Sequence, residues 1–304
     1  MNKEVKRIYR SKKVKSYFYG DTLELTTATG HKGRKYYKLS DTEYIDINGE
    51  LKQFKKSTRK SDNLDSVKKT MRRLRRLIAN NFNGSRNELW ITLTYKENMR
   101  DQKRLSSDMR QFMKKLRRKY GSLEYIAVLE PQKRGAWHYH ILLKRNDSES
   151  LYIANKDIAK FWGHGFTKTT ALTESDNVSA YLMAYLTDLD LNEDVKTDKK
   201  KIVKGLRLEM YPPNMQIYRC SNGIVKPIED NGTQEQMVNK YLNEYYGNKK
   251  HNRALHNRDN MNVTPDFYGE KKIKSAYSDG RDMVVETEFY NFKQYSKGGE
   301  SYDD

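Results

Sequence analysis

The chain has 304 residues, enough for one large domain or two smaller ones. Lys and Arg total 59 against 40 Asp and Glu, and the resulting net charge of +19 attracts polyanions such as DNA, RNA or an anionic membrane. The single cysteine, Cys220, excludes an internal disulfide and a multi-cysteine zinc finger. No stretch reaches the ~18 apolar residues of a membrane span, and residues 1–15 lack the apolar core of a secretory signal. We therefore expect a cytoplasmic protein with no membrane partner.

The first third of the chain predicts a β-rich extension followed by a helix. Residues 1–60 contain strand-like segments, such as 16–25 and 43–54, separated by Gly and Asp turns. Apolar residues then recur at the three- and four-residue spacing of a helix, at Leu64, Val67, Met71, Leu74 and Ile78. The opposite face of this helix carries only basic charges, on Lys68, Lys69, Arg72, Arg73, Arg75 and Arg76. Such a run is typical either of a solvated face or of a surface that binds phosphates.

From residue 88 the order of elements indicates a fold. Strand-like patterns occupy 89–95, 123–131, 136–144 and 166–172, and helical patterns occupy 106–119 and 155–162. The order β-α-β-β-α-β is that of the ferredoxin-like split unit, an antiparallel sheet with helices on one face. The predicted class is α+β, and a further helix is expected at 175–186.

The last third is less regular. A charged loop at 196–201 precedes a β-like stretch that ends at 217–220, and a helical pattern occupies 234–246. The polar, acidic end, 298–304, predicts disorder. We expect three regions: an N-terminal extension (1–60), a central domain (61–195) and a C-terminal extension (196–304).

Two histidines stand out in the strand Trp137-His138-Tyr139-His140. Side chains two residues apart in a strand point to the same face of the sheet, so His138 and His140 could together begin a metal site. A pair of hydrogen-bonded structural histidines would give the same pattern.

The preceding hairpin adds an acidic residue to this pair. If Lys133-Arg134-Gly135 forms a three-residue turn with Gly135 in the left-handed conformation, Glu130 lies opposite His138 on the same face. A register slip of one residue would send Glu130 to the other face. Two imidazoles and one carboxylate form a mixed nitrogen and oxygen set that suits Mg²⁺ or Mn²⁺.

Two tyrosines follow the histidine strand. Tyr181 and Tyr185 are four residues apart, so a helix would place them on one face. A phenol can attack a phosphodiester, especially beside a metal that polarises the phosphate. The alternative is packing in the core, because the same segment carries an apolar stripe of Val178, Leu182, Leu186 and Leu189.

Together these features resemble the HUH endonucleases, in the branch of rolling-circle replication initiators. The resemblance spans residues 86–190 and rests on three ordered motifs: the strand Trp90–Tyr95, the ligand set Glu130, His138 and His140, and the tyrosines Tyr181 and Tyr185. Tyrosines placed after the histidine motif are similar to those of initiators rather than of conjugative relaxases. A pair of tyrosines looks like the phage-type initiators and certain transposases. Many members have Lys three residues after the tyrosine, where this chain has Ala184 and Asp188.

The resemblance implies an HUH endonuclease domain within residues 61–195 and a metal-dependent enzyme that nicks and rejoins single-stranded DNA at a replication origin. It implies a 5′-phosphotyrosine intermediate on Tyr181 or Tyr185 and a rolling-circle element such as a plasmid or phage. The chain has no G-x-x-x-x-G-K-[ST] phosphate loop, so a separate host helicase would unwind the DNA and a host polymerase would extend it. The alternatives are an HUH-type transposase of the same chemistry and a non-catalytic nucleic-acid-binding module.

Overall fold

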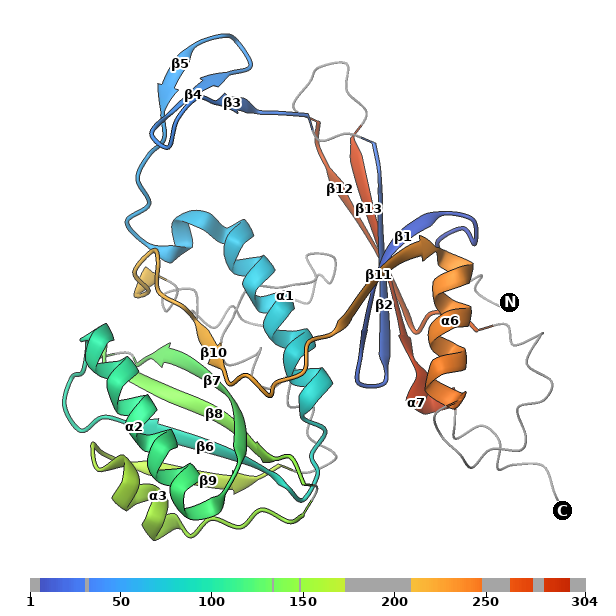
Figure 1. Cartoon of the computed structure of the whole chain (residues 1–304). Helices are drawn as coiled ribbons and strands as arrows, with labels where there is room; N and C mark the ends of the chain where they lie inside the picture. Colours follow the sequence, from blue (N-terminus) through green and yellow to red (C-terminus); the bar gives the residue numbers. More distant parts are fainter. Residues whose placement is uncertain are drawn as a thin grey trace, which may run out of the picture. The chain divides into compact units, whose positions relative to one another are not determined.

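The computed structural model describes residues 6–30, 33–132, 134–147, 149–172, 209–247, 263–275 and 282–295. The chain divides into two compact units (Figure 1). We call residues 57–226 the central unit, and residues 1–56 together with 227–304 the terminal unit. Each unit has its own cluster of buried apolar side chains.

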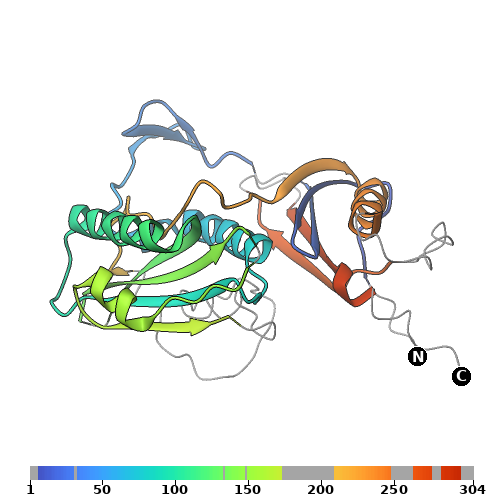
Figure 2. The same ribbon diagram turned by 60° about the horizontal axis from the view of Figure 1, so that its bottom comes forward.

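The central unit contains an antiparallel sheet of five strands in the order β10-β7-β8-β6-β9. Its elements are β6 (Glu88–Thr94), α2 (Gln102–Tyr120), β7 (Leu123–Pro131), β8 (Trp137–Arg145), α3 (Asn155–Trp162), β9 (Thr167–Ala171) and β10 (Tyr218–Cys220). The first six follow the predicted order β-α-β-β-α-β, and their strands are arranged β9-β6-β8-β7, as in the ferredoxin-like unit. The predicted fold class is confirmed, and Figure 2 shows the same unit from a second side.

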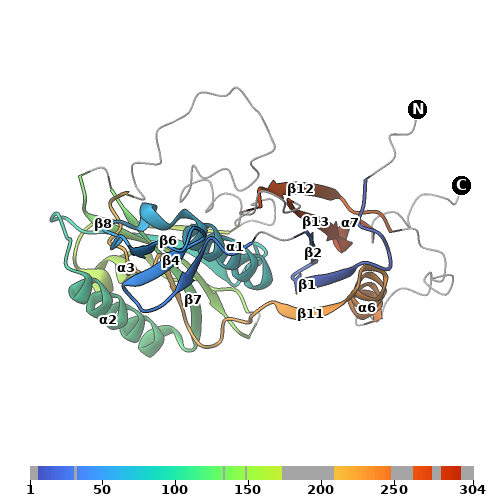
Figure 3. The ribbon, with the colours of Figure 1, turned by 90° about the horizontal axis from the view of Figure 1, so that it is seen from above.

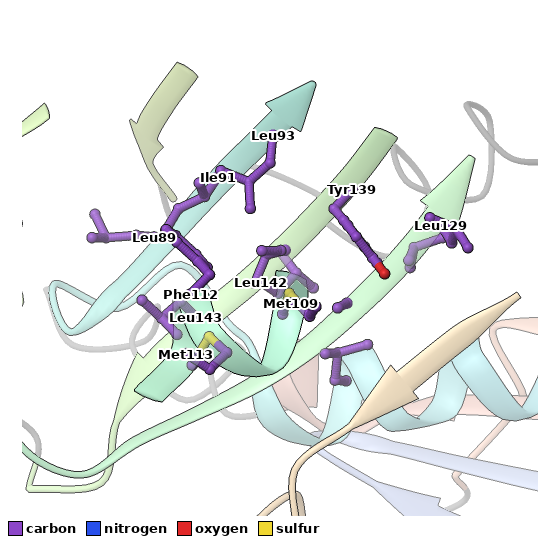
Figure 4. Packing of buried hydrophobic residues seen from close by; sticks show 14 of the residues in the cluster. Leu89, Ile91, Leu93, Met109, Phe112, Met113, Leu129, Tyr139, Leu142 and Leu143 are labelled. Carbon is purple, nitrogen blue, oxygen red and sulfur yellow. The ribbon is translucent and has the colours of Figure 1, made fainter. Parts of the chain in front are cut away.

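Helix α2 covers one face of this sheet. It begins after Asp101, whose carboxylate accepts hydrogen bonds from two backbone N–H groups of the first turn, and it ends at Gly121, where φ is +82°. One side of the helix is buried, through Leu105, Met109, Phe112, Met113 and Leu116. These side chains pack against strand residues such as Leu89, Ile91 and Leu143 (Figure 4). The Tyr139 hydroxyl donates to the carbonyl of Leu105 at 3.0 Å, so Tyr139 faces α2.

Helix α1 (Leu64–Asn81) belongs to the opposite face. A short 3₁₀ turn, Lys60–Asn63, precedes it, and the Asn63 side chain caps it by accepting from the Ser66 N–H at 3.1 Å. The predicted stripe is buried at Val67, Met71, Leu74 and Ile78. The ammonium of Lys144 donates to the carbonyl of Asn81 at 3.2 Å. Because side chains alternate along β8, Lys144 lies on the face of His138 and His140, away from Tyr139.

The terminal unit is built from both ends of the chain. Its sheet has the order β11-β1-β2-β13-β12. The elements are β1 (Lys13–Tyr19), β2 (Thr22–Thr29), β11 (Ile228–Thr233), α6 (Gln234–Gly247), β12 (Phe267–Ile273), β13 (Met283–Asn291) and α7 (Phe292–Tyr295). Helix α6 packs against β1, β2 and β11, and Figure 3 shows it beside β1 and β11. A small separate sheet contains β3 (Tyr36–Lys38), β4 (Glu43–Asp46) and β5 (Leu51–Gln53).

The sequence assigned the two ends of the chain to separate extensions, and the structure places strands from both in one sheet. Strand β1 pairs with β11, and β2 pairs with β13. Pairing between strands more than 200 residues apart leaves no local pattern, so periodicity could not reveal it. The helix expected at 234–246 is confirmed as α6. The expected helix at 175–186, the loop at 196–201 and the acidic end lie outside the described residues. No helix in the described ranges is long and apolar enough to cross a membrane.

Candidate metal centre

The hairpin between β7 and β8 fixes the register of the candidate site. Its turn is closed by two hydrogen bonds, from the Gln132 N–H to the Ala136 carbonyl at 2.7 Å and from the Gly135 N–H to the Gln132 carbonyl at 2.8 Å. Gly135 has φ +89°, and a Cβ there would lie 2.5 Å from Nη2 of Arg100. Backbone conformation and space therefore both favour glycine. The predicted three-residue connection is confirmed, and Glu130 lies opposite His138.

This register brings the three expected side chains together. Oε2 of Glu130 lies 3.0 Å from Nε2 of His138 and 3.0 Å from Nε2 of His140. One ligand atom from each residue lies within 4.8 Å of the other two. The prediction that Glu130, His138 and His140 share one face is confirmed. Because the side chain of Glu130 is 2% exposed and those of His138 and His140 are 14% and 7% exposed, the site is almost closed to water.

Burial determines the charge state of the two imidazoles. Desolvation lowers the pKa of His138 from 6.5 to about 4. Desolvation first, and then the charge of His138, lowers the pKa of His140 to about 3. Both rings are therefore neutral at pH 7, which is the form of histidine that binds metals.

A neighbouring strand orients one of the rings. Thr92 of β6 lies opposite His140 in the β6–β8 pairing, and its Oγ1 is 3.3 Å from Nδ1 of His140. A hydroxyl can either donate or accept. When it accepts from Nδ1–H, Nε2 of His140 carries a lone pair directed toward Glu130, as a metal ligand requires. The ring of Trp90 meets the His140 ring edge-on, with centroids 5.8 Å apart, and limits its rotation.

The donor set fits a divalent cation. A buried carboxylate and two neutral imidazoles gathered around one point supply one anionic oxygen and two nitrogen lone pairs. Without an ion, each Nε2–H donates to the carboxylate instead. The same three residues can therefore satisfy one another in the free protein and turn to a cation when one binds.

The structure does not place every residue that the sequence singled out. Tyr181, Tyr185, Ala184 and Asp188 lie outside the described residues. His164, which no motif assigned to the site, belongs to a different cluster in the α2–α3 region. Its Nε2 is 3.6 Å from Oδ2 of Asp108, and its ring stacks on that of Tyr95 at 5.7 Å.

Thr92 is the residue that the sequence did not single out. It lies in the strand Trp90–Tyr95, already recognised as a motif, but its part in the site depends on which strand pairs with β8. The ferredoxin-like order places β6 next to β8, and this order together with strand alternation is the signal that could have identified it.

Residues 88–190 match one protein-family model, described as a replication-associated protein family of the ORF2 type. The matched segment is roughly a third of the chain and contains Glu130, His138 and His140, as well as Tyr181 and Tyr185. It begins at the first residue of β6, the strand that carries Thr92. Neither the curated proteins nor the solved structures contain a match to this chain.

Proposed function

We propose that this protein is a replication initiator that nicks and rejoins single-stranded DNA at a rolling-circle origin, using a divalent metal and a tyrosine nucleophile. The observation that carries the proposal is the buried set of Glu130, His138 and His140, with ligand atoms within 4.8 Å of one another. It lies within the segment that matches a replication-associated family, on a strand followed by two tyrosines. The net charge of +19 supports a DNA substrate.

We assign Glu130, His138 and His140 to the binding of Mg²⁺ or Mn²⁺. Bound there, the ion would polarise the scissile phosphate as a Lewis acid. His138 and His140 contribute because burial keeps them neutral at pH 7, so no proton must be removed before they bind. Thr92 holds the ring of His140 in position. The low exposure of the three side chains excludes water that would otherwise compete for the ion.

We assign the nucleophile to Tyr181, with Tyr185 as its partner in the closing transfer. The phenol oxygen forms a bond to phosphorus, and the bond from phosphorus to the 3′ oxygen breaks. That oxygen takes up a proton and leaves as a free 3′-hydroxyl, while the 5′ side stays linked to the tyrosine. A host polymerase would extend the hydroxyl, and a second transfer would reclose the strand. A separate helicase would unwind the duplex, because the chain has no phosphate loop.

The test is capture of the covalent intermediate. An origin-derived oligonucleotide is incubated with the protein and Mn²⁺, and the product is denatured and digested for mass spectrometry. We expect phosphotyrosine at Tyr181, and no adduct from the Tyr181→Phe variant, which keeps the aromatic ring. The Tyr185→Phe variant should still cut but should fail to reclose the strand. An adduct on neither tyrosine would overturn the proposal, and one on Tyr185 alone would reverse the two assignments.

A further inference from the structure

The outer surface of α2 carries a row of basic side chains that the metal centre does not use. Lys103, Arg110, Lys114 and Arg118 are all exposed. At 100° per residue they cluster on the side of α2 directly away from its buried residues. We call these four residues the α2 stripe. From its first to its last residue the stripe extends about 22 Å along the helix, at 1.5 Å per residue.

The α2 stripe is not neutralised within the described part of the chain. No side chain of the stripe forms an ion pair or a hydrogen bond with another described residue. The single acid of the helix, Asp108, lies off the stripe, where it accepts from the hydroxyl of Tyr95 at 3.0 Å and lies 3.6 Å from the guanidinium of Arg104. Other cations of α2 are already engaged, such as Lys119, which pairs with Asp157 at 2.6 Å. The stripe is thus a set of positive charges held in a row on a rigid element.

This arrangement costs the helix stability. Arg110 and Lys114, and Lys114 and Arg118, are like charges four residues apart, and each such pair destabilises a helix by about 0.2–0.5 kcal/mol. Arg118 lies in the last turn, where the helix dipole favours a cation. The dipole does not account for Arg110 and Lys114, which lie further from the end. A polyanion that neutralises the row would remove the repulsion.

The α2 stripe and the metal centre lie on opposite sides of the sheet. Tyr139 points to the α2 face, where its hydroxyl donates to the carbonyl of Leu105. His138 and His140 flank Tyr139 in the same strand and therefore point to the other face. The stripe is on the solvent side of α2, with the helix and the sheet between it and the metal ligands. A short strand bound at the metal centre would not reach the stripe.

The chemistry of the α2 stripe favours a duplex over a single strand. Single-strand surfaces usually combine basic groups with aromatic side chains on which bases stack. The positions between the cations on this side of α2 are Ser107 and Gln111, which are polar and can hydrogen-bond to phosphate oxygens but offer no stacking surface. In a duplex the bases are already stacked on one another, and the backbone presents its phosphates outward.

We propose that the α2 stripe is a second DNA-binding surface, which holds the phosphate backbone of a duplex segment separate from the strand at the metal centre. The inference extends the proposed function, because one protein would then grip the cleaved strand and a duplex on opposite faces. It does not require that function, since the stripe would bind duplex DNA of any sequence whether or not the chain cuts DNA.

The test measures binding rather than nicking. The four residues are changed together, as Lys103→Gln, Arg110→Gln, Lys114→Gln and Arg118→Gln, which keeps long polar side chains and a good helix former at each position. Binding of labelled duplex DNA of unrelated sequence is followed by fluorescence anisotropy across a salt series in excess chelator. The matched control removes basic charge from the terminal unit, as Lys271→Gln, Lys272→Gln and Lys274→Gln, at three exposed positions. Circular dichroism confirms that both variants are folded.

We expect the stripe variant to bind duplex DNA on the order of a hundredfold more weakly at 0.1 M salt, with a log–log salt slope reduced by about 3–4. The control variant should change both values much less. Nicking of a short oligonucleotide should be the same in the stripe variant and the wild-type protein. An unchanged slope for duplex DNA, an equal loss in the control, or a loss confined to single strands would overturn the inference. Absence of nicking in every variant would count against the proposed function and leave the binding result intact.

Discussion

Two buried glutamates, one in each unit, show how differently a sheet can hold a carboxylate. Glu288 in the terminal unit and Glu130 in the central unit are 0% and 1% exposed. Glu288 accepts from the backbone N–H of Ile8 and, at 2.8 Å, from the hydroxyl of Tyr290. Glu130 instead faces two neutral imidazoles, which can donate a proton or offer a lone pair.

The difference separates a structural carboxylate from a ligand. A buried charge that is surrounded by hydrogen-bond donors needs no ion, because those donors replace its water. A buried carboxylate among groups that can either donate or coordinate can exchange its hydrogen bonds for a cation. The surroundings of the carboxylate, rather than its burial, therefore identify Glu130 as the candidate ligand.

The largest expected effect is on cleavage, and it should be confined to the site of Glu130. His138→Ala or His140→Ala should lower the nicking rate by more than about a hundredfold, because loss of a mere supporting group of a metal ligand already costs 10–100-fold. Glu130→Ala should lower it less. The measurement is single-turnover cleavage of an origin oligonucleotide with Mn²⁺, with His164→Ala as the matched control. Full activity of the His138→Ala protein in excess chelator would remove the metal centre from the account.

Substituting the two glutamates should have opposite effects on unfolding. Glu288→Gln should lower the free energy of unfolding by about 1–3 kcal/mol, since an amide cannot accept from all of the same donors. Its effect should be the same with or without Mn²⁺. Glu130→Gln should instead abolish the rise in Tm that Mn²⁺ gives the wild-type protein, a rise that follows from binding to the folded state alone. Thermal unfolding with and without the ion measures both effects, and a Mn²⁺-dependent Tm in Glu130→Gln would end the distinction.

The metal-free protein should lose stability in acid because of the two histidines. The pKa of His138 is about 4 and that of His140 about 3 in the folded state, against 6.5 unfolded, so the unfolded chain binds more protons between these values. The free energy of unfolding should therefore fall as pH drops from 6.5 toward 4. Denaturant titrations across this range would measure it. A His138→Ala, His140→Ala double variant should show a shallower fall, and an equal fall would mean that the rings are exposed.

The smallest expected effect concerns the basic face of α1. Arg72→Ala, Arg73→Ala and Arg76→Ala together should reduce the salt slope of single-strand binding by about 0.7 for each phosphate contact that is lost. Arg72 and Arg73 are exposed, so the fold should tolerate the change. Titrations at several salt concentrations provide the measurement. An unchanged slope would indicate that this face is only solvated.

Local chemistry explains why the sequence predicted the metal centre better than the terminal unit. A three-residue turn ending in Gly135 fixes the register of the hairpin, and that register alone brings Glu130 opposite His138. By contrast, β2 pairs with β13 across more than 200 residues. Each of those strands depends on the other for its partner, and no turn between them sets the pairing, so the sequence indicated strands near the N-terminus without their arrangement.

The most direct test of the account is a calorimetric titration of Mn²⁺ into the metal-free protein at pH 7. We predict one ion bound per chain in the wild-type protein and in the His164→Ala control. We predict that binding is lost in the triple variant Glu130→Gln, His138→Ala, His140→Ala, while circular dichroism shows that the fold is kept. Equal binding by the folded triple variant would contradict the assignment of the metal centre and, with it, the proposed chemistry.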